Sequence, residues 1–250
     1  KEIYKLMSQK ILKEDVGIII LEKKPPRLWH HMQEVAGKIT TDYLIFLHDD
    51  DLIHEDFLLK TWETILKERP SALATRVNFI GRNDKSLNHR QYIPRKKIVR
   101  LTENKILLKY FSPFERSVIF PTIAYKRDLL LSYWRTYKRH LGFGEDVRMV
   151  HFFSKSGRFL ENQNSRLFKY RMYEGQQSTK CTGYARLIII AWLKTIKLNF
   201  LNKSLFLFLA KLQYIIYSKS NFSKNNFLGK FILKTRPKLV WLRRGGKENK

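Results

Sequence analysis

The stretch DYLIFLHDDDLIHEDFL, residues 42–58, contains the two features on which the interpretation of this sequence depends. Its first seven residues are almost all apolar, which is typical of a strand covered on both faces and favours a parallel strand. Three consecutive carboxylates follow, Asp49, Asp50 and Asp51, in a chain whose formal net charge is +27. Because adjacent like charges repel one another, we expect this position to hold a positively charged ligand.

The segments around this stretch alternate between strand-like and helix-like patterns. Short apolar runs predict further strands at 16–21, 72–80, 117–125 and 167–173. Longer runs predict helices at 28–38, 54–70 and 126–134. The apolar face expected for the helix at 54–70 consists of Phe57, Leu58, Trp62, Ile65 and Leu66. Strands that alternate with helices predict an α/β fold, with a mostly parallel sheet flanked by helices.

The acidic run has a chemical explanation in metal binding. In open α/β sheets, ligands bind beyond the carboxyl ends of the strands, and the aspartates follow such an end. Mg²⁺ uses one or two carboxylates and completes its shell with phosphate and water, so a cation that also holds a diphosphate would account for the run. The alternative is that Asp51 and its neighbours only cap a helix that begins near Ile53, but a cap requires one aspartate.

A second acidic point occurs in GFGEDV, residues 142–147. Two glycines precede a predicted helix whose first residues are Glu145 and Asp146. One interpretation is that these acids only complement the helix dipole, which contributes about 0.3–1 kcal/mol. The other is that one of them is a general base, on a loop that can approach a sugar hydroxyl.

Composition limits the partners of the chain. Lys and Arg number 49 against 22 Asp and Glu, which implies an anionic partner such as nucleic acid, anionic lipid or a phosphorylated substrate. Hydrophobic residues make up 44%, which predicts a folded core and not disorder. Cys181 is the single cysteine, so no intrachain disulfide can form.

The composition changes near residue 180. Residues 180–250 contain sixteen Lys and Arg and one acid, Glu248, and lysines interrupt their apolar stretches. This pattern predicts a tail of basic amphipathic helices that follows a catalytic domain at 1–179 and lies on an anionic membrane surface. The alternative is that Ile188, Trp192 and their apolar neighbours pack against the catalytic domain.

Three segments, taken together and in order, resemble the family 2 glycosyltransferases: TTDYLIFLHDDDLIHEDFL (40–58), GFGEDVRMVHFFSKSGRF (142–159) and YRMYEGQQS (170–178). The family consists of inverting, metal-dependent enzymes of the GT-A fold that use nucleotide-diphospho-sugars. The resemblance implies Mn²⁺ or Mg²⁺ as cofactor and a UDP-sugar as donor. It implies a saccharide or lipid-linked acceptor in cell-surface polysaccharide or glycolipid synthesis, at the cytoplasmic face of the membrane.

Roles follow from the resemblance residue by residue. Asp50 would bind the metal with support from Asp51, and Asp49 would lie near the ribose or the metal. The family often has an Asp at the position of His48, so these roles could shift by one residue. Asp146 would be the catalytic base, with Glu145 beside it.

The third segment implies contacts with the diphosphate. Arg171 and Ser178 would contact its phosphates, whereas Tyr173 stands where the family commonly has a His. Two nucleotide-binding motifs expected near the start of the family pattern do not occur in this sequence. We therefore expect the chain as given to be truncated and to bind nucleotide-sugar poorly.

Two other classes of function stay open at the level of sequence. The charge is compatible with a nucleic-acid-binding protein, although the sequence has no zinc-finger or RNA-recognition motif. An acidic metal site would also serve a phosphotransferase or a nuclease. Specific binding to nucleic acid is not expected, because the acidic run lies at the position predicted for the ligand.

Overall fold

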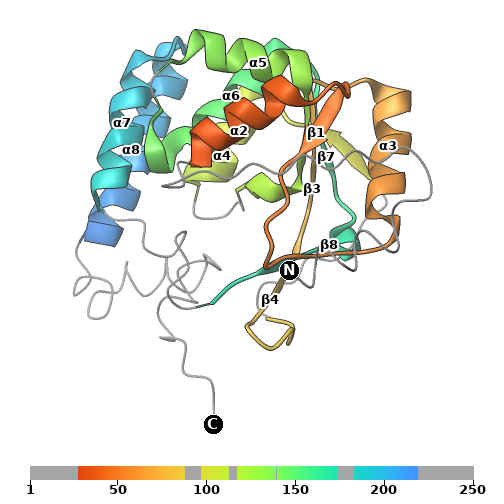
Figure 1. Ribbon diagram of the computed structural model, residues 1–250. Coiled ribbons are helices and arrows are strands. Elements are labelled where there is room, and N and C mark those ends of the chain that lie inside the picture. The colour runs from red at the N-terminus through yellow and green to blue at the C-terminus, as the bar shows by residue number, and fades with distance from the viewer. Residues whose placement is uncertain (1–27, 88–96, 113–116, 139, 174–182, 219–250) are drawn as a thin grey trace.

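The computed structural model describes residues 28–87, 97–112, 117–138, 140–173 and 183–218 (Figure 1). The strands are β1 Tyr43–Ile45, β2 Leu52–Ile53, β3 Ala72–Thr75, β4 Asn78–Ile80, β5 Ile98–Arg100, β6 Ile123–Lys126, β7 Phe159–Asn162 and β8 Phe168–Arg171. The α-helices are α2 Leu28–Lys38, α3 Asp56–Glu68, α4 Glu103–Phe111, α5 Arg127–Thr136, α6 Glu145–Ser156, α7 Gly183–Thr195 and α8 Phe200–Ser218. Short 3₁₀ turns are η2 Phe120–Thr122, η3 Gly142–Gly144 and η4 Ser165–Leu167. The strand predicted at 16–21 and the binding residue Ser178 lie outside the described residues.

The described strands form two sheets. The larger has the order β1-β6-β3-β7-β5, and the smaller has the order β2-β8-β4. Only β3–β7 and β4–β8 pair in parallel, whereas the other four described pairings are antiparallel. The prediction of a mostly parallel sheet is therefore wrong for the described strands. Because helices cover both faces of the sheet, its strands are apolar whether they run parallel or antiparallel to their neighbours. An apolar run therefore does not predict the direction of a strand.

The predicted strand at 72–80 is two strands in different sheets. β3 belongs to the larger sheet and β4 to the smaller one. The chain turns at Arg76, whose backbone N–H donates to the carbonyl of Asn162 (2.9 Å) and whose guanidinium pairs with Glu161 (3.0 Å). The continuous apolar pattern did not show this break, because residues on both sides of Arg76 are buried. The break sends β4 toward β8 and the acidic turn.

The two faces of the larger sheet pack against different helices. Ile65 of α3 packs with Leu73, Ala124 and Leu160, which lie on one face. The neighbouring positions along the same strands point to the other face, as expected for the two-residue repeat of a strand, and join the main core with α2 and α4–α8. Figure 1 shows α3 on one side of the strands and α5 and α6 on the other.

The helix predicted at 54–70 is present as α3, but its expected apolar face is only partly correct. Phe57 and Ile65 are buried, and Phe57 packs edge-on against Phe168 at 5.4 Å between ring centroids. Leu58, Trp62 and Leu66 are instead about half exposed, at 56%, 49% and 58%. The buried row lies at positions 57, 61 and 65, and the exposed residues form the adjacent row of the helix.

The described part of the basic tail packs against the rest of the protein. Trp192 and Leu193 of α7 and Phe206 of α8 are buried in the main core. Leu205 and Phe208, in contrast, are exposed. The domain division at residues 179 and 180 falls outside the described residues and stays a prediction. Across the described chain, every helix is too short or too polar to cross a bilayer.

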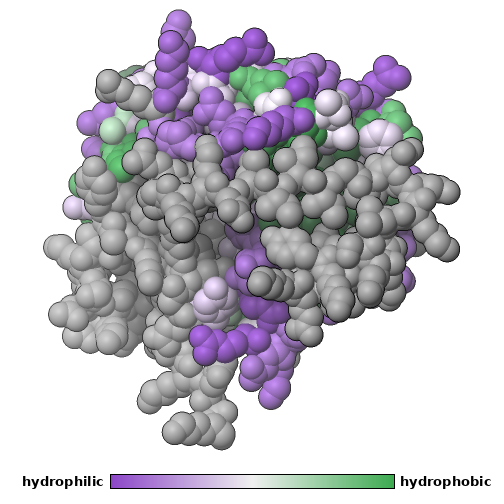
Figure 2. Space-filling view, viewed as in Figure 1, coloured by the Kyte–Doolittle hydropathy of each residue, from purple (hydrophilic) through white to green (hydrophobic). Residues whose placement is uncertain are grey.

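The surface of the described residues mixes polar and apolar side chains. In the space-filling view, hydrophilic and hydrophobic side chains alternate along the upper rim of the molecule (Figure 2). Isolated exposed apolar residues are normal on soluble proteins, whereas a continuous exposed apolar stripe marks a contact surface.

Candidate active site

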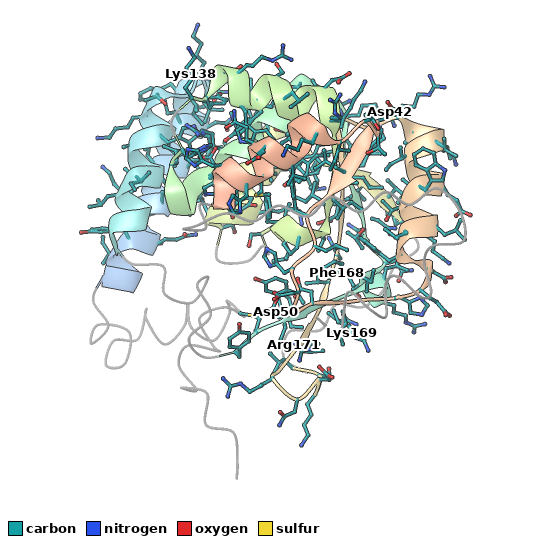
Figure 3. The ribbon with its side chains drawn as sticks, in the orientation of Figure 1. Asp42, Asp50, Lys138, Phe168, Lys169 and Arg171 are labelled. Atoms are coloured by element: carbon teal, nitrogen blue, oxygen red, sulfur yellow. The ribbon has the colours of Figure 1, made fainter. Side chains whose placement is uncertain are left out.

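The acidic turn follows β1 and leads into β2. Asp49 and Asp50 occupy the turn, and Asp51 directly precedes β2, which pairs antiparallel with β8. This pairing brings Asp51 beside Arg171 at the end of β8, whose backbone N–H donates to Asp51 Oδ1 (2.9 Å). Figure 3 shows Asp50 and Arg171 close together at the lower end of the molecule. Residues 120 positions apart in the sequence therefore meet in one site.

Three side chains of this turn could hold a metal ion together. One ligand atom each of His48, Asp50 and Asp51 lies within 4.8 Å of the others. Asp50 and Asp51 were predicted as metal ligands, and the structure brings them together. Asp49 is not in this group. His48 is in the group although it was not predicted as a ligand; the available signal was that the resembling family often has an Asp at this position.

The electrostatic state of Asp51 fits a cation site. Its side chain is 1% exposed, and Oδ2 accepts no hydrogen bond from any residue that the structure describes. The pKa of this carboxyl is raised to about 7, mainly by burial and also by the negative charge of Asp50, although the hydrogen bond from the Arg171 backbone lowers it. Because a buried carboxylate oxygen is costly without a partner, a cation would stabilise the ionised form.

His48 is also suited to metal binding. Burial lowers the pKa of its imidazole, against the raising effect of Asp50 and Asp49. A lowered pKa favours the neutral ring, which is the form that coordinates metals. The group therefore offers one imidazole nitrogen and two carboxylates, a donor set that Mn²⁺ accepts and that Mg²⁺ accepts through its oxygens.

Arg171 holds the acidic turn in place. Its Nε donates to the carbonyl of Asp50 (2.6 Å), and its Nη1 donates to the carbonyls of Gly81 and Arg82 (both 3.0 Å). The same nitrogen pairs with Asp84 (2.5 Å). These contacts join the acidic turn to the loop after β4. The predicted phosphate contact of Arg171 stays a prediction, and the structure adds a positioning role.

Glu145 is fully buried, and both of its carboxylate oxygens accept hydrogen bonds. The Tyr133 hydroxyl donates to Oε1, the backbone N–H of Leu141 donates to Oε2 (2.6 Å), and Arg148 Nη2 donates to both (2.8 Å). The Arg148 guanidinium also stacks on the Tyr137 ring, 4.5 Å from its centroid. Glu145 therefore connects the loop before α6 to α5 and α6. This geometry supports a structural role, and its catalytic role stays a prediction.

The Glu145–Arg148 pair leads to a prediction about stability. Glu145→Gln leaves the buried Arg148 without its counter-charge, so we expect the free energy of unfolding to fall by about 3–5 kcal/mol. Urea denaturation followed by circular dichroism measures this change. The matched control is Glu68→Gln, which breaks a pair with Arg158 that is half exposed and should change stability by less than about 1 kcal/mol. Equal effects of the two substitutions would contradict the structural role.

Asp146 is half-buried at the start of α6. Burial raises the pKa of Tyr125, and the negative charge of Asp146 raises it further, which places this carboxylate near that ring. The Tyr125 ring also packs against Phe46, 6.2 Å between centroids, just after β1 and four residues before Asp50. Tyr125 therefore lies between the segment that leads to the acidic turn and the N-terminal end of α6.

Two sheets flanked by helices, with a carboxylate and imidazole group at the end of an apolar strand, define an α/β protein with a candidate divalent-cation site. Residues 7–134 match the family model described as Glycosyl transferase family 2. The matched segment is just over half of the 250 residues and includes the acidic turn. The chain belongs to glycosyl transferase family 2, so it is a glycosyltransferase that takes its sugar from a nucleotide-sugar. The match ends before Asp146.

Solved structures confirm the fold class. The chain is similar to S. aureus TarS 1-349 in complex with UDP-GlcNAc, with 12% identity, 95% of this chain and 70% of that chain covered, and a TM-score of 0.58. The chain is also similar to a second solved structure, that of S. aureus TarS 1-349, with 13% identity, 96% of this chain and 67% of that chain covered, and a TM-score of 0.58. At such identities the likeness shows the fold, which is GT-A-like. No curated protein sequence matches the chain.

Proposed function

We propose that the protein transfers a sugar from a UDP-sugar to an acceptor hydroxyl, with inversion at the anomeric carbon and with the help of a divalent cation. The observation that carries the proposal is the buried Oδ2 of Asp51, which accepts no hydrogen bond from the described residues and lies 3.9 Å from His48 Nδ1, in one group with Asp50. Family membership supports the nucleotide-sugar. The solved complex of TarS with UDP-GlcNAc supports UDP as the nucleotide of the donor.

Two separate groups of residues would carry out the two parts of the reaction, cation binding and proton transfer. His48, Asp50 and Asp51 would hold Mn²⁺ or Mg²⁺, which as a Lewis acid offsets charge that grows on the departing diphosphate. Asp146 would accept the proton of the acceptor hydroxyl as its oxygen attacks the anomeric carbon from the face opposite the diphosphate. In the same step the carbon–oxygen bond to the diphosphate would break, the diphosphate would leave with the bonding electrons, and the new bond would have the inverted configuration.

The acceptor would be a saccharide or a lipid-linked saccharide in the synthesis of a cell-surface polysaccharide or glycolipid. A cytoplasmic location at the inner face of the cell membrane is part of this proposal. The rival functions are distinguished by their products. A phosphotransferase or nuclease would release phosphoryl groups or cut nucleic acid, whereas the proposed reaction yields a glycoside and UDP.

The metal site is tested with the metal alone. We expect Asp50→Asn to weaken Mn²⁺ binding at least about tenfold, because it removes one of two anionic ligands. Electron paramagnetic resonance measures free Mn²⁺ during a titration of the 250-residue chain. The control is Asp56→Asn on α3, which removes an exposed carboxylate that pairs with Lys60. Equal Mn²⁺ affinity of the Asp50 variant and the unsubstituted chain would remove the main support for the proposal.

A further inference from the structure

The outward face of α8 is apolar over most of its length. Leu201, Leu205, Phe208 and Ile215 are 78%, 45%, 62% and 43% exposed. Their spacing of four, three and seven residues places them on one face of the helix. From Leu201 to Ile215 this stripe is about 21 Å long, at 1.5 Å per residue. We call these four residues the α8 stripe.

The opposite face of α8 fixes the helix to the protein. Phe206 and Ala210 are buried in the main core. Gln213 Nε2 donates to the carbonyls of Tyr110 and Phe111 (3.0 and 2.8 Å) at the end of α4. A helix that is apolar on all sides is ordinarily buried on all sides or in contact with lipid. Since α8 is anchored by one face, the α8 stripe is a rigid apolar surface that no described element covers.

The charged residues of α7, of α8 and of the loop between them have one sign. Residues 183–218 contain five Lys and Arg and no Asp or Glu. Lys194, Lys197 and Lys211 are exposed on the α7–α8 pair. The comparable exposed apolar row on α3 lies among charges of both signs, from Asp56 to Glu68. The surface that covers the α8 stripe must therefore be apolar and negatively charged.

We propose that the α8 stripe docks on an anionic lipid bilayer, with α8 parallel to the membrane plane and with Lys194, Lys197 and Lys211 at the level of the headgroups. A helix bound in this way inserts its apolar face at the boundary of headgroups and acyl chains and does not span the bilayer. A symmetric contact with a second copy is disfavoured, because it would bring the same lysines against one another. The docking rests on α8 alone, and only its use for a lipid-linked acceptor rests on the proposed function.

The test measures how the 250-residue chain co-sediments with vesicles. We expect binding to phosphatidylglycerol–phosphatidylcholine vesicles, little binding to pure phosphatidylcholine, and weaker binding as salt is raised. The double substitution Leu205→Ser/Phe208→Ser should lower the affinity at least about tenfold, since it removes two inserted apolar side chains. Lys197→Gln should lower it about fivefold. The matched control, Leu58→Ser/Leu66→Ser on α3, should bind like the unsubstituted chain.

Several results would overturn the proposal. Unchanged binding of the α8 double variant would show that the stripe does not contact lipid, and so would equal binding to charged and neutral vesicles. An equal loss in the α3 control would show that exposed apolar area in general was responsible. If light scattering shows a dimer that the α8 variant dissociates, the stripe is a contact between two copies. The Mn²⁺ titration of the α8 variant should be unchanged, which separates this test from that of the active site.

Discussion

Asp146→Asn is expected to lower the rate of sugar transfer by about 10²–10⁴-fold, the contribution typical of a general base. Asn has nearly the same size as Asp but cannot accept the proton of the acceptor hydroxyl. Binding of the donor should persist, because the cation group His48, Asp50 and Asp51 is on another segment. The measurement is kcat for transfer from a UDP-sugar, with donor binding followed by calorimetry.

The structure favours Asp146 over Glu145 as the base. Both oxygens of Glu145 are occupied by hydrogen bonds inside the protein, and its side chain is fully buried. Asp146 is half-buried and is the next residue, in the first turn of α6. The control is Asp128→Asn, in the first turn of α5, whose carboxylate is 80% exposed. Transfer by the Asp146 variant at nearly the unsubstituted rate would mean that another group is the base.

Asp51→Asn is expected to stabilise the metal-free protein above pH 7 by about 2–4 kcal/mol, while it abolishes the stabilisation by Mn²⁺. The pKa of Asp51 is raised from 3.8 to about 7 in the folded protein. Between these values the folded chain holds a proton that the unfolded chain has lost. The stability of the metal-free protein therefore falls as pH rises from about 4 to about 7, and Asn removes this dependence.

The same titration affects metal binding, since the cation must displace the proton from Asp51. We expect the affinity for Mn²⁺ to fall as pH decreases below about 7. Thermal unfolding at pH 5 and pH 8, with EDTA or with Mn²⁺, measures both effects. Asp56→Asn on α3 is the control, because its exposed carboxylate is not in the cation group. A destabilised Asp51 variant at pH 8 in EDTA would show that Oδ2 has a partner other than a cation.

Local patterns in the sequence were sufficient to predict the main helices and strands and the family. The helix at 28–38, the strand that precedes the acidic run, and the turn and helix of GFGEDV are present in the structure. The acidic run was singled out by charge alone, and two of its aspartates lie in the candidate cation group. Helix and strand periodicities and adjacent charges are properties of neighbouring residues, so they can be read along the chain.

Only the tertiary structure decided which segments distant in the sequence pack together and which side chains they bury. It set the antiparallel direction of β6, separated β3 from β4, buried Asp51 against Arg171, and enclosed Glu145 between α5 and α6. It also left one apolar row of α8 exposed while it buried the other. The reason is that burial, strand direction and the pKa of a carboxyl depend on contacts between residues far apart in the sequence, which no local pattern encodes.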